Sequence, residues 1–479
     1  MVPNLLILLD IMHKELLFFA SFCFLIGSTD DLIFDGLWLF YKFRRKFFIK
    51  PEYQKATVES LNPPDPSRPM AVFVPTWNEA AVIGAMLRRC LTQWSEDHFR
   101  IYVGCYPNDQ ETILAVAQAG FGSDKIRLIV CREPGPTSKA DCLNNLWDAL
   151  CRDEIEERMR FEAIVLHDAE DIVHPNALNL LQHLVARAAL VQLPVIPRRA
   201  RNSRWIAGHY GDEFAEMHGK QMVLREALGA AIPSAGVGCA FARNGLSELS
   251  VRTRGRPFDA NSLTEDYELG LHLTGGKERG IFARLEDPCG QLIATQEFFP
   301  DNLEDAIRQK SRWMAGIALN GWDRMGWKSS GWKNSWRENW MRLRDRKASF
   351  AAVILAIGYI TIILTGLLIL ADLLGIYSAQ PVSEIVRMML VANLFFLLWR
   401  LGLKSYFVFS LYGMREAFLS IPRTIVANVI NILAAWRAMG RYLDQLSGLP
   451  PKWEKTVHFY PPSQDVQKLR LQENSGADG

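Results

Sequence analysis

Several common functional signatures are missing from this sequence. The formal net charge is only +2, so overall charge gives no argument for a nucleic-acid partner. The eight cysteines are scattered without a CxxC pair or a Cys/His zinc pattern, which favours reduced thiols in a domain that faces the cytosol. No GxGxxG follows the first predicted strand and no GxxxxGKS/T is found, so dinucleotide-binding and P-loop proteins lose support. The opening MVPNLLILLD has no positive charge and no small-residue cleavage site follows it, which argues against a cleaved signal peptide.

Long apolar runs are present, and the first predicts an N-terminal transmembrane segment with a basic flank in residues 1–50. Residues 16–26 and 32–41 are apolar and together are long enough to cross a bilayer of about 30 Å. Five Lys and Arg residues follow within residues 42–50. By the positive-inside tendency, this end of the segment is expected on the cytoplasmic side.

Three acidic residues interrupt this first segment. Asp30, Asp31 and Asp35 are unusual in a membrane span, because charged groups at that depth are costly. Either they face the interior of a helix bundle or a watery cavity, or the helix ends near Gly27 and the rest lies at the membrane interface. The sequence leaves both interpretations open.

A second apolar region, residues 348–445, predicts further membrane and interfacial helices. Residues 350–371 form an uncharged run that predicts a span leaving the cytoplasm, and residues 388–412 predict the returning span. Residues 418–436 include Pro, Arg and Asn, which suits an interfacial or re-entrant helix better than a free span. Residues 446–479 are expected to form a cytoplasmic tail.

Charged residues lie inside and beside these predicted spans. Arg400 and Lys404 interrupt the returning span, where they either snorkel to the cytoplasmic headgroups, as we expect, or face a polar translocation path. Residues 321–347 interleave Trp with Arg and Lys, which predicts helices in the headgroup region. Aromatic and basic residues also bind single-stranded nucleic acid, but the adjoining span favours contact with membrane lipids.

The middle of the chain, residues 51–320, has the pattern of an α/β domain that follows a proline-rich linker at 51–69. Short apolar strands alternate with helices of about 10–15 residues, which predicts a parallel sheet covered on both faces. The strands are expected at 71–75, 101–103, 126–130 and 163–166, and the helices at 79–91, 112–119, 139–150 and 176–190, with Asn78 and Ser138 as caps of the first and third helices.

Polar residues follow each of these strands, where an open parallel sheet binds its ligands. The residues are Glu79, Asp109 and Lys139 after the first three strands, and Asp168, Glu170 and Asp171 after the fourth. Three carboxylates within four residues repel one another unless a cation or hydrogen-bond donors compensate. Mg²⁺ or Mn²⁺ bridging to a diphosphate is the natural compensation, because these cations take oxygen ligands. The alternative is that one carboxylate caps the following helix.

Three further features follow the predicted strands. Residues 233–239 are small and turn-prone, which suits either the close approach of a bulky ligand or a tight turn. Thr264, Glu265 and Asp266 open a predicted helix, and alone they are most simply an N-cap with acids in the first turn. An amide, a cation and a flat aromatic surface come later, at Gln309, Arg312 and Trp313.

Together these residues resemble the membrane-bound family 2 glycosyltransferases, which include cellulose, chitin and hyaluronan synthases. The resemblance covers roughly residues 70–320 and rests on the order and spacing of its motifs. The motifs are Pro75…Asn78-Glu79, Asp109, Asp168-x-Glu170, Thr264-Glu265-Asp266 and Gln309-x-x-Arg312-Trp313. The resemblance implies a GT-A fold, which is a Rossmann-like catalytic domain with a mostly parallel sheet.

The resemblance also implies a role for each residue. Glu79 and Asp109 would hold the uridine of a UDP-sugar, and Lys139 would lie near the nucleotide or diphosphate. Asp168 and Glu170 would take the DxD place and bind the Mg²⁺ or Mn²⁺ and the diphosphate. The second acid is a glutamate here, so either Glu170 or Asp171 would complete the metal site. Asp266 would be the catalytic base with Glu265 beside it, and Gln309, Arg312 and Trp313 would line the acceptor and diphosphate side.

A closer resemblance is to the glycosyltransferase part of the NfrB-type bacterial inner-membrane proteins, known as phage-adsorption factors. It rests on the phrases at residues 106–109, 167–171 and 427–431. Those proteins usually carry a further C-terminal domain that binds cyclic di-GMP. This sequence stops after a polar tail, so regulation by that nucleotide is not expected.

The expected reaction follows from the chemistry of these groups. A sugar hydroxyl is a weak nucleophile, so a positioned carboxylate must accept its proton. The leaving diphosphate builds charge that a metal and Arg312 would offset. One base on the face opposite the leaving group predicts a single displacement with inversion.

The sequence therefore predicts a multi-pass enzyme of the bacterial inner membrane with a cytoplasmic catalytic domain. It would extend an exopolysaccharide from a UDP-sugar, with an outer-membrane or periplasmic export partner as a further expectation and no nucleic acid. Two alternatives stay open. One is single sugar transfer to a polyprenyl phosphate or other lipid, and the other is a catalytically silent membrane scaffold or phage-receptor component.

Overall fold

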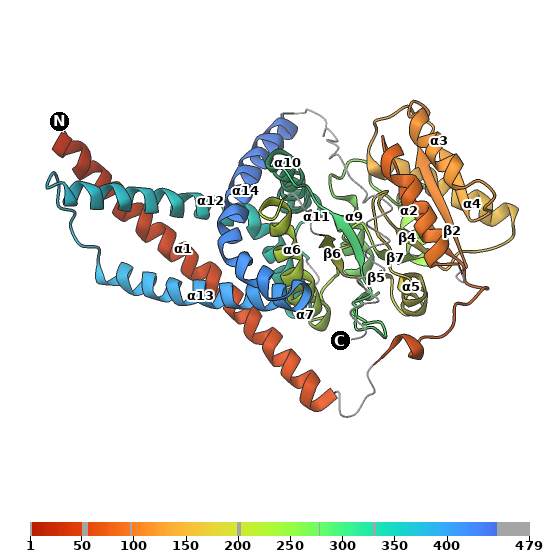
Figure 1. The fold of residues 1–479 in the computed structure, drawn as a ribbon, viewed down its shortest axis with the longest axis horizontal. Helices are drawn as coiled ribbons and strands as arrows, with labels where there is room; N and C mark the ends of the chain where they lie inside the picture. The colour runs from red at the N-terminus through yellow and green to blue at the C-terminus, as the bar shows by residue number, and fades with distance from the viewer. Residues whose placement is uncertain are drawn as a thin grey trace.

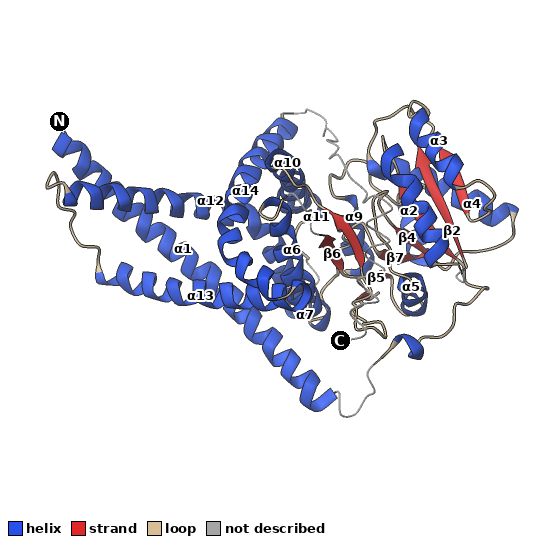
Figure 2. Cartoon of the chain, in the orientation of Figure 1, coloured by secondary structure: helices blue, strands red, loops and turns tan. Residues whose placement is uncertain are grey.

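The computed structural model describes residues 2–49, 56–95, 98–198, 203–276, 278–328 and 332–447. Figures 1 and 2 show two regions: long helices alone on one side, and a sheet with helices packed on it on the other. The predicted tail lies outside the described residues from residue 448 onward, and so does the start of the predicted linker.

A seven-stranded sheet forms the centre of the α/β region, in the order β3-β2-β1-β4-β7-β5-β8. Strands β1 to β4 are parallel, as predicted, whereas β7 runs antiparallel between β4 and β5. Strands β6 and β9 pair separately in parallel. The strands are β1 Met70–Pro75, β2 Phe99–Cys105, β3 Ile126–Val130, β4 Ala163–Leu166, β5 Leu190–Gln192, β6 Val195–Arg198, β7 Cys239–Ala242, β8 Gly280–Phe282 and β9 Thr295–Phe298.

Helices cover both faces of the sheet and build the second region. The α/β region holds α2 Ala80–Gln93, α3 Gln110–Ala119, α4 Lys139–Glu156, α5 Ala177–Val185, α6 Ile206–Glu216, α7 Met222–Ala227, α8 Arg243–Arg252, α9 Glu265–Thr274 and α10 Leu303–Trp313, with π-helical turns at Met217–Gln221 and Met314–Asn320. The remaining helices are α1 Val2–Arg44, followed by a π-helical turn at Arg45–Ile49, then α11 Gly321–Met325, α12 Trp332–Leu373, α13 Glu384–Tyr412 and α14 Met414–Leu446; a short 3₁₀ turn lies at Val58–Ser60.

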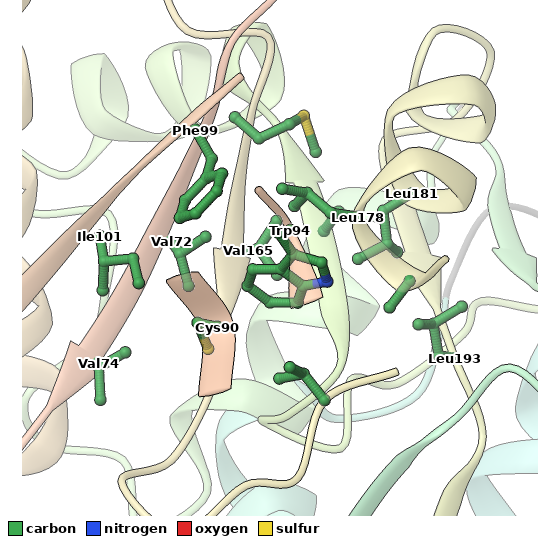
Figure 3. Close-up of a cluster of buried hydrophobic side chains, with 14 of the residues drawn as sticks. Val72, Val74, Cys90, Trp94, Phe99, Ile101, Val165, Leu178, Leu181 and Leu193 are labelled. Carbon is green, nitrogen blue, oxygen red and sulfur yellow. The ribbon is translucent and has the colours of Figure 1, made fainter. Parts of the chain in front are cut away.

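The core of the sheet explains why its first strand is apolar throughout. Val72 and Val74 point into one apolar cluster with α2 and α5, part of which Figure 3 shows. Ala71 and Phe73 point to the opposite face, where they pack with α4. Successive side chains of a strand alternate between faces, so a strand buried on both faces needs no polar positions. The predicted α/β class is therefore confirmed.

Two local predictions are wrong. Asn78 does not cap α2, the first helix of the α/β region: Glu79 occupies the cap position and its side chain makes no cap hydrogen bond. The helix predicted at 176–190 ends at Val185, because residues 190–192 pair with β7 and β8 as strand β5. The predicted cap at Ser138 is confirmed, since its hydroxyl accepts a hydrogen bond from the Asp141 N–H at 3.2 Å.

The described part of the chain has four helices long and apolar enough to cross a membrane, at Asn4–Ile49, Ser335–Leu373, Glu384–Tyr412 and Met414–Leu446. Helix α1 runs through Gly27 without a break, so the interpretation in which it ends there is wrong. Helix α12 likewise continues past residue 347, where the sequence suggested a boundary between interfacial and membrane helices.

Helix α14 includes the segment predicted to be interfacial or re-entrant, and its polarity has a structural cause. The Arg423 guanidinium is buried and binds both oxygens of Asp212 on α6, at 2.6 and 2.9 Å. Figure 1 shows α14 at a steep angle to α12 and α13, beside α6 and α10. Its polar residues therefore dock the helix against the α/β region.

Candidate active site

A cavity of about 1430 Å³ lies at the carboxyl ends of β1 and β4, bounded by the start of α9 and the end of α10. Its wall includes most of the predicted site residues, although they come from segments far apart in the sequence. They are Glu79, Lys139, Asp168, Glu170, Glu265, Asp266, Gln309, Arg312 and Trp313. Asp109 and Asp171 are not part of this wall.

Asp109 lies behind the part of the cavity wall that carries Glu79. Its carboxylate caps α3 and accepts a hydrogen bond from the Asn78 N–H at 2.6 Å. Asn78 has a positive φ of 54°, which its short polar side chain tolerates better than most residues. The Glu79 N–H donates to Thr112 Oγ1 at 2.9 Å. Asp109 therefore fixes the turn that presents Glu79, and its predicted contact with uridine stays a prediction.

The loop before Lys139 is held by close packing. Gly135 lies against the rings of Trp77 and Tyr106, where a Cβ would come within 2.5 and 2.8 Å of ring atoms. Asn108 exchanges two hydrogen bonds with the Gly135 backbone, each of 2.7 Å. This packing fixes the start of α4, so Lys139 enters the cavity from a defined position.

Lys139 is the cation at the centre of the site. Its Nζ lies 2.6 Å from Asp168 Oδ1. Burial lowers the pKa of Lys139, but the charges of Asp168, Glu265 and Asp266 outweigh burial and raise it above its ordinary value. A permanent positive charge therefore joins the end of β4 to the start of α9.

Asp266 and Glu265 form the acidic side of this arrangement. Burial and the Asp266 charge raise the pKa of Glu265 to about 7. Burial also raises the pKa of Asp266, against the opposing effect of Lys139. The Tyr267 N–H donates to Asp266 Oδ1 at 2.8 Å, and a Cβ at Gly236 would overlap Asp266 Oδ2. The small residues at 233–239 thus make room for the side chain of Asp266, and Gly236 also needs its positive φ of 78°.

Asp171 differs from its two neighbours. It is 0% exposed, and its Oδ2 binds His167 Nδ1 at 2.6 Å and accepts from the Asp168 N–H at 3.2 Å. Burial lowers the pKa of His167 to about 4. Glu170, not Asp171, therefore lies on the cavity wall with Asp168. The sequence analysis did not predict a role for His167, although it lies four residues before Asp171 in the sequence.

Within the described ranges, no group of three or more His, Cys, Asp or Glu side chains is placed to hold a metal by itself. Asp168 and Glu170 line the cavity as a pair. Mg²⁺ is usually bound through one or two carboxylates together with substrate phosphates, so this donor set fits such a cation.

The cavity wall that carries Gln309, Arg312 and Trp313 is built by α10 and the π-helical turn that follows it. Trp313 packs edge-on against Tyr210 and Phe299, with ring centroids 6.0 and 6.3 Å apart. In the following turn, a Cβ at Gly316 would come within 2.5 Å of Thr264 Cγ2. The predicted helix start at Thr264 and the Trp313 segment are therefore in direct contact. Thr264 takes the cap position, but its side chain makes no cap hydrogen bond.

The same cavity continues between the long helices, where residues of α1, α12, α13 and α14 line it. Arg400 and Lys404 belong to this wall, and Arg400 Nη1 lies 2.6 Å from Asp31 Oδ2. Lys404 Nζ donates to Thr424 Oγ1 at 3.2 Å. Both cations therefore lie on the cavity wall with acidic and hydroxyl partners on neighbouring helices, which agrees with the alternative in which they face a polar path; their position relative to the headgroups stays a prediction.

Comparison with known families agrees with this geometry. The model of the family described as "Glycosyltransferase like family 2" matches residues 66–316. The chain belongs to this family, and it is a glycosyltransferase with the GT-A fold and additional long apolar helices.

Among individual proteins, the chain is similar to Bacteriophage adsorption protein B of Escherichia coli strain K12. The two are 34% identical over 473 residues, which cover 93% of this chain and 62% of that protein. Bacteriophage N4 adsorption protein B of Escherichia coli O157:H7 matches to the same extent. The chain thus spans less than two thirds of the length of these relatives.

Solved structures give more distant likenesses. One is a mannosyltransferase from Pyrobaculum calidifontis in complex with GDP-Man and Mn²⁺, with 15% identity and a TM-score of 0.49 over 87% of this chain and 98% of that chain. Another is glucosyl-3-phosphoglycerate synthase from Mycobacterium tuberculosis in complex with Mn²⁺, UDP-glucose and phosphoglyceric acid, with 16% identity and a TM-score of 0.34 over 58% of this chain and 88% of that chain.

Proposed function

We propose that this glycosyltransferase transfers a sugar from a UDP-sugar to a growing polysaccharide at the bacterial inner membrane, with inversion at the anomeric carbon. One observation carries the proposal: a single cavity contains the charged site and continues between the long helices. One end of this cavity can receive a soluble donor and the other end lies between the membrane helices, which suits a product that leaves through or along the bilayer. The four long apolar helices support a multi-pass location, and the basic flank of α1 supports a cytoplasmic catalytic domain.

Asp266 is the proposed base. A general base works best when its pKa lies near the working pH, and burial moves the pKa of Asp266 upward in that direction. The Tyr267 N–H and the close approach of Gly236 hold its carboxylate in place. Its ionised form takes the proton of the acceptor hydroxyl as that oxygen attacks the anomeric carbon. Since one base serves one attack, an α-linked donor would give a β-linkage.

The opposite side of the cavity receives the donor. Glu79 is placed by the turn after β1, and Lys139 and Arg312 bring positive charge for the diphosphate oxygens. Asp168 and Glu170 would hold Mg²⁺ or Mn²⁺ together with those oxygens. When bound, the cation would offset the charge that develops on the leaving UDP.

The acceptor is proposed to be a polymer because of Trp313. Its ring lines the cavity and is fixed by Tyr210 and Phe299, so it offers a rigid surface on which a sugar ring can lie. The name of the E. coli relatives, bacteriophage adsorption protein, supports a product or assembly that reaches the cell surface. Such a route calls for a periplasmic or outer-membrane export partner.

Transfer to a lipid acceptor is a second candidate, and the membrane part of the cavity favours it. That wall includes apolar side chains such as Phe24, Leu355 and Leu394, which suit an acyl or polyprenyl chain. The length of the product separates the two candidates. A polymer runs as a ladder or smear on a gel, whereas a single transfer gives one product of fixed mass.

The test is UDP release by the purified protein with Mn²⁺ and a panel of UDP-sugars. The wild-type chain should release UDP from at least one donor, and Asp266→Asn should abolish release while leaving donor binding intact. Asp124→Asn, at an exposed position, is the matched control and should be fully active. An active Asp266→Asn variant would show that the base is misassigned. A wild-type chain that is silent with every donor would favour a scaffold or phage-receptor role.

A further inference from the structure

Two hydrogen-bond acceptors on α6 and α10 lie buried in the cavity wall without a partner among the described residues; Thr264, Asn393 and Asn431 carry others elsewhere on this wall. The first two are Nε2 of His209, on α6, and Oε1 of Gln309, on α10. Their residues are 1% and 9% exposed. A buried polar atom that makes no hydrogen bond costs free energy, so such atoms in a cavity wall are expected to serve a ligand.

His209 has a defined protonation state. Its Nδ1 is hydrogen-bonded to the Ile206 carbonyl oxygen, so Nδ1 carries the proton and Nε2 is an acceptor. Burial, together with the charge of Lys310, lowers the pKa of His209 to about 3. The ring packs against Tyr210 with centroids 4.1 Å apart. The side chain is therefore neutral, rigid and able only to accept a hydrogen bond at Nε2.

The position of His209 relates it to the acceptor side of the active site. Tyr210, its neighbour, packs edge-on against Trp313 at 6.0 Å, and the Lys310 ammonium lies 5.5 Å from the Tyr210 ring. Lys310 also forms an ion pair with Glu213 of α6, so α6 and α10 form one wall. Helix α6 packs on α13 as well, and the charge of Lys404 on α13 contributes to the lowered pKa of His209. His209 thus lies between Trp313 and the membrane helices.

We propose that His209 Nε2 and Gln309 Oε1 form an acceptor-sugar subsite on the membrane side of Trp313, which takes a sugar unit behind the one that is glycosylated. The inference rests on the proposed polysaccharide function and extends it to the substrate class of this wall. His209 acts as a specificity residue that orients the acceptor, and it takes no part in proton transfer.

The chemistry of the subsite selects its ligand. Both unpartnered atoms accept hydrogen bonds, so the ligand must donate, as the hydroxyl or acetamido N–H groups of a sugar do. A phosphate oxygen would face the lone pair of Nε2 and could form no hydrogen bond there. The subsite therefore favours a neutral glycan over the headgroup of a lipid phosphate.

The experiment measures binding and transfer separately, using the full chain in detergent. The probes are cellotetraose, chitotetraose and a polyprenyl phosphate, each titrated into the wild type and into His209→Phe, His209→Gln and the exposed-site control His98→Phe. We expect His209→Phe to weaken binding of at least one tetrasaccharide about tenfold, which corresponds to one lost hydrogen bond. Polyprenyl phosphate binding and the KM for the UDP-sugar should be unchanged. His209→Gln, which keeps an acceptor oxygen, should recover part of the loss.

Thermal stability separates this role from a structural one. His209→Phe removes a buried acceptor without a partner, so its Tm should equal or exceed that of the wild type. Tetrasaccharide binding equal to wild type, or a lower Tm with donor and acceptor binding weakened together, would overturn the proposal. If the wild type transfers no sugar yet binds a tetrasaccharide through His209, the subsite stands and the proposed function fails.

Discussion

Two clusters of three acidic residues look alike in the sequence but have different partners in the structure. The cluster in α1 is Asp30, Asp31 and Asp35, and the cluster after β4 is Asp168, Glu170 and Asp171. In α1 each acid meets cations or indole N–H groups from other helices. The partners of Asp30 and Asp31 are Arg344, Lys347 and Arg400, with Trp340 on Asp30, and those of Asp35 are Lys220 and Trp399.

The cluster after β4 lies beside a cation that it shares with other acids. Lys139 is the cation that forms an ion pair with Asp168, and it is shared electrostatically with Glu265 and Asp266. Asp171 is buried and is hydrogen-bonded to His167. The difference teaches that the partners of the acids, more than the density of acids, distinguish a cluster that joins helices from one at a strand end that shares its lysine with Glu265 and Asp266. Carboxylates on a cavity wall can hold a divalent cation, which in turn binds a diphosphate.

The largest expected effect is the loss of activity in Asp168→Asn. The substitution removes the carboxylate that pairs with Lys139 and that would hold the metal with Glu170. We expect sugar transfer, measured as UDP release, to fall by about 1000-fold, as when a charge-stabilising group is removed from other active sites. The Tm should change little, because the charges of Glu265 and Asp266 stay beside Lys139.

The control for this variant is Asp148→Asn, which breaks the exposed pair of Asp148 with Arg132 on the same domain. Exposed pairs contribute little to stability, so this variant should keep both activity and Tm. Retention of more than a tenth of the activity by Asp168→Asn would make the cluster after β4 structural, like the one in α1.

Asp31→Asn should have the opposite effect: it should lower the stability of the protein and leave the reaction with the UDP-sugar unchanged. It removes the carboxylate shared by Arg344, Lys347 and Arg400, at distances of 2.6 to 2.9 Å, and leaves three cations close together between the helices. Breaking a largely buried pair is costly, and with discounting for the partial exposure of these groups we expect a loss of about 2–3 kcal/mol. Thermal unfolding in detergent should show a lower Tm, while the KM for the UDP-sugar stays unchanged.

The matched variant on the membrane side is Glu384→Gln, which breaks an exposed pair with Arg387 at the start of α13. Its Tm should equal that of the wild type. A raised KM or a lowered kcat in Asp31→Asn without a change of Tm would instead give the α1 acids a direct part in the reaction.

Much of the catalytic domain was predictable because its signals are local. The apolar runs around β1 to β4 and the polar residues after them placed the sheet edge and most of the site. The antiparallel strand β7 was not predictable, because residues 239–242 are ordered by long-range pairing with β4 and β5. Residues 190–192 form strand β5 instead of the end of a predicted helix, because they pair with β7.

Within the site, the sequence predicted which acidic residues take part but not which of their side chains line the cavity. Asp109 and Asp171 were expected at the ligand, yet backbone N–H groups and His167 hold them outside the cavity wall. Arg400 and Lys404 could not be placed, because their partners lie on other helices. His209 belongs to no motif, and its importance rests on an unpartnered atom that only the three-dimensional packing reveals.

A smaller effect is expected for Asp171→Asn. The amide oxygen can still accept from His167 and from the Asp168 N–H, so the fold should be retained. An amide oxygen is a weaker acceptor than a carboxylate, so the backbone of Asp168 is held less firmly, and changes of this kind behind a metal ligand typically cost about tenfold in metal affinity or activity. We expect the Mn²⁺ concentration for half-maximal UDP release to rise by about that factor. A wild-type Mn²⁺ dependence would show that Asp171 is only a packing residue.

The smallest effect concerns Glu265, where two carboxylates share one lysine. Burial and Asp266 raise the pKa of Glu265 to about 7, above its ordinary value of 4.5. Between these values the folded state keeps a proton that the unfolded state releases, so stability falls as pH rises from about 4.5 to 7. Glu265→Gln cannot ionise, and it also relieves the repulsion on Asp266.

The Tm of the wild type should therefore fall relative to that of Glu265→Gln between pH 5 and pH 7.5, by roughly 2 °C. Above this range the difference should be constant. Glu111→Gln, an exposed change on α3, should follow the wild type throughout. Parallel Tm curves for the wild type and Glu265→Gln would mean that Lys139 neutralises both carboxylates. The pair would then belong with the fully compensated acids of α1, and the contrast between the two kinds of acidic cluster would apply to the β4 cluster alone.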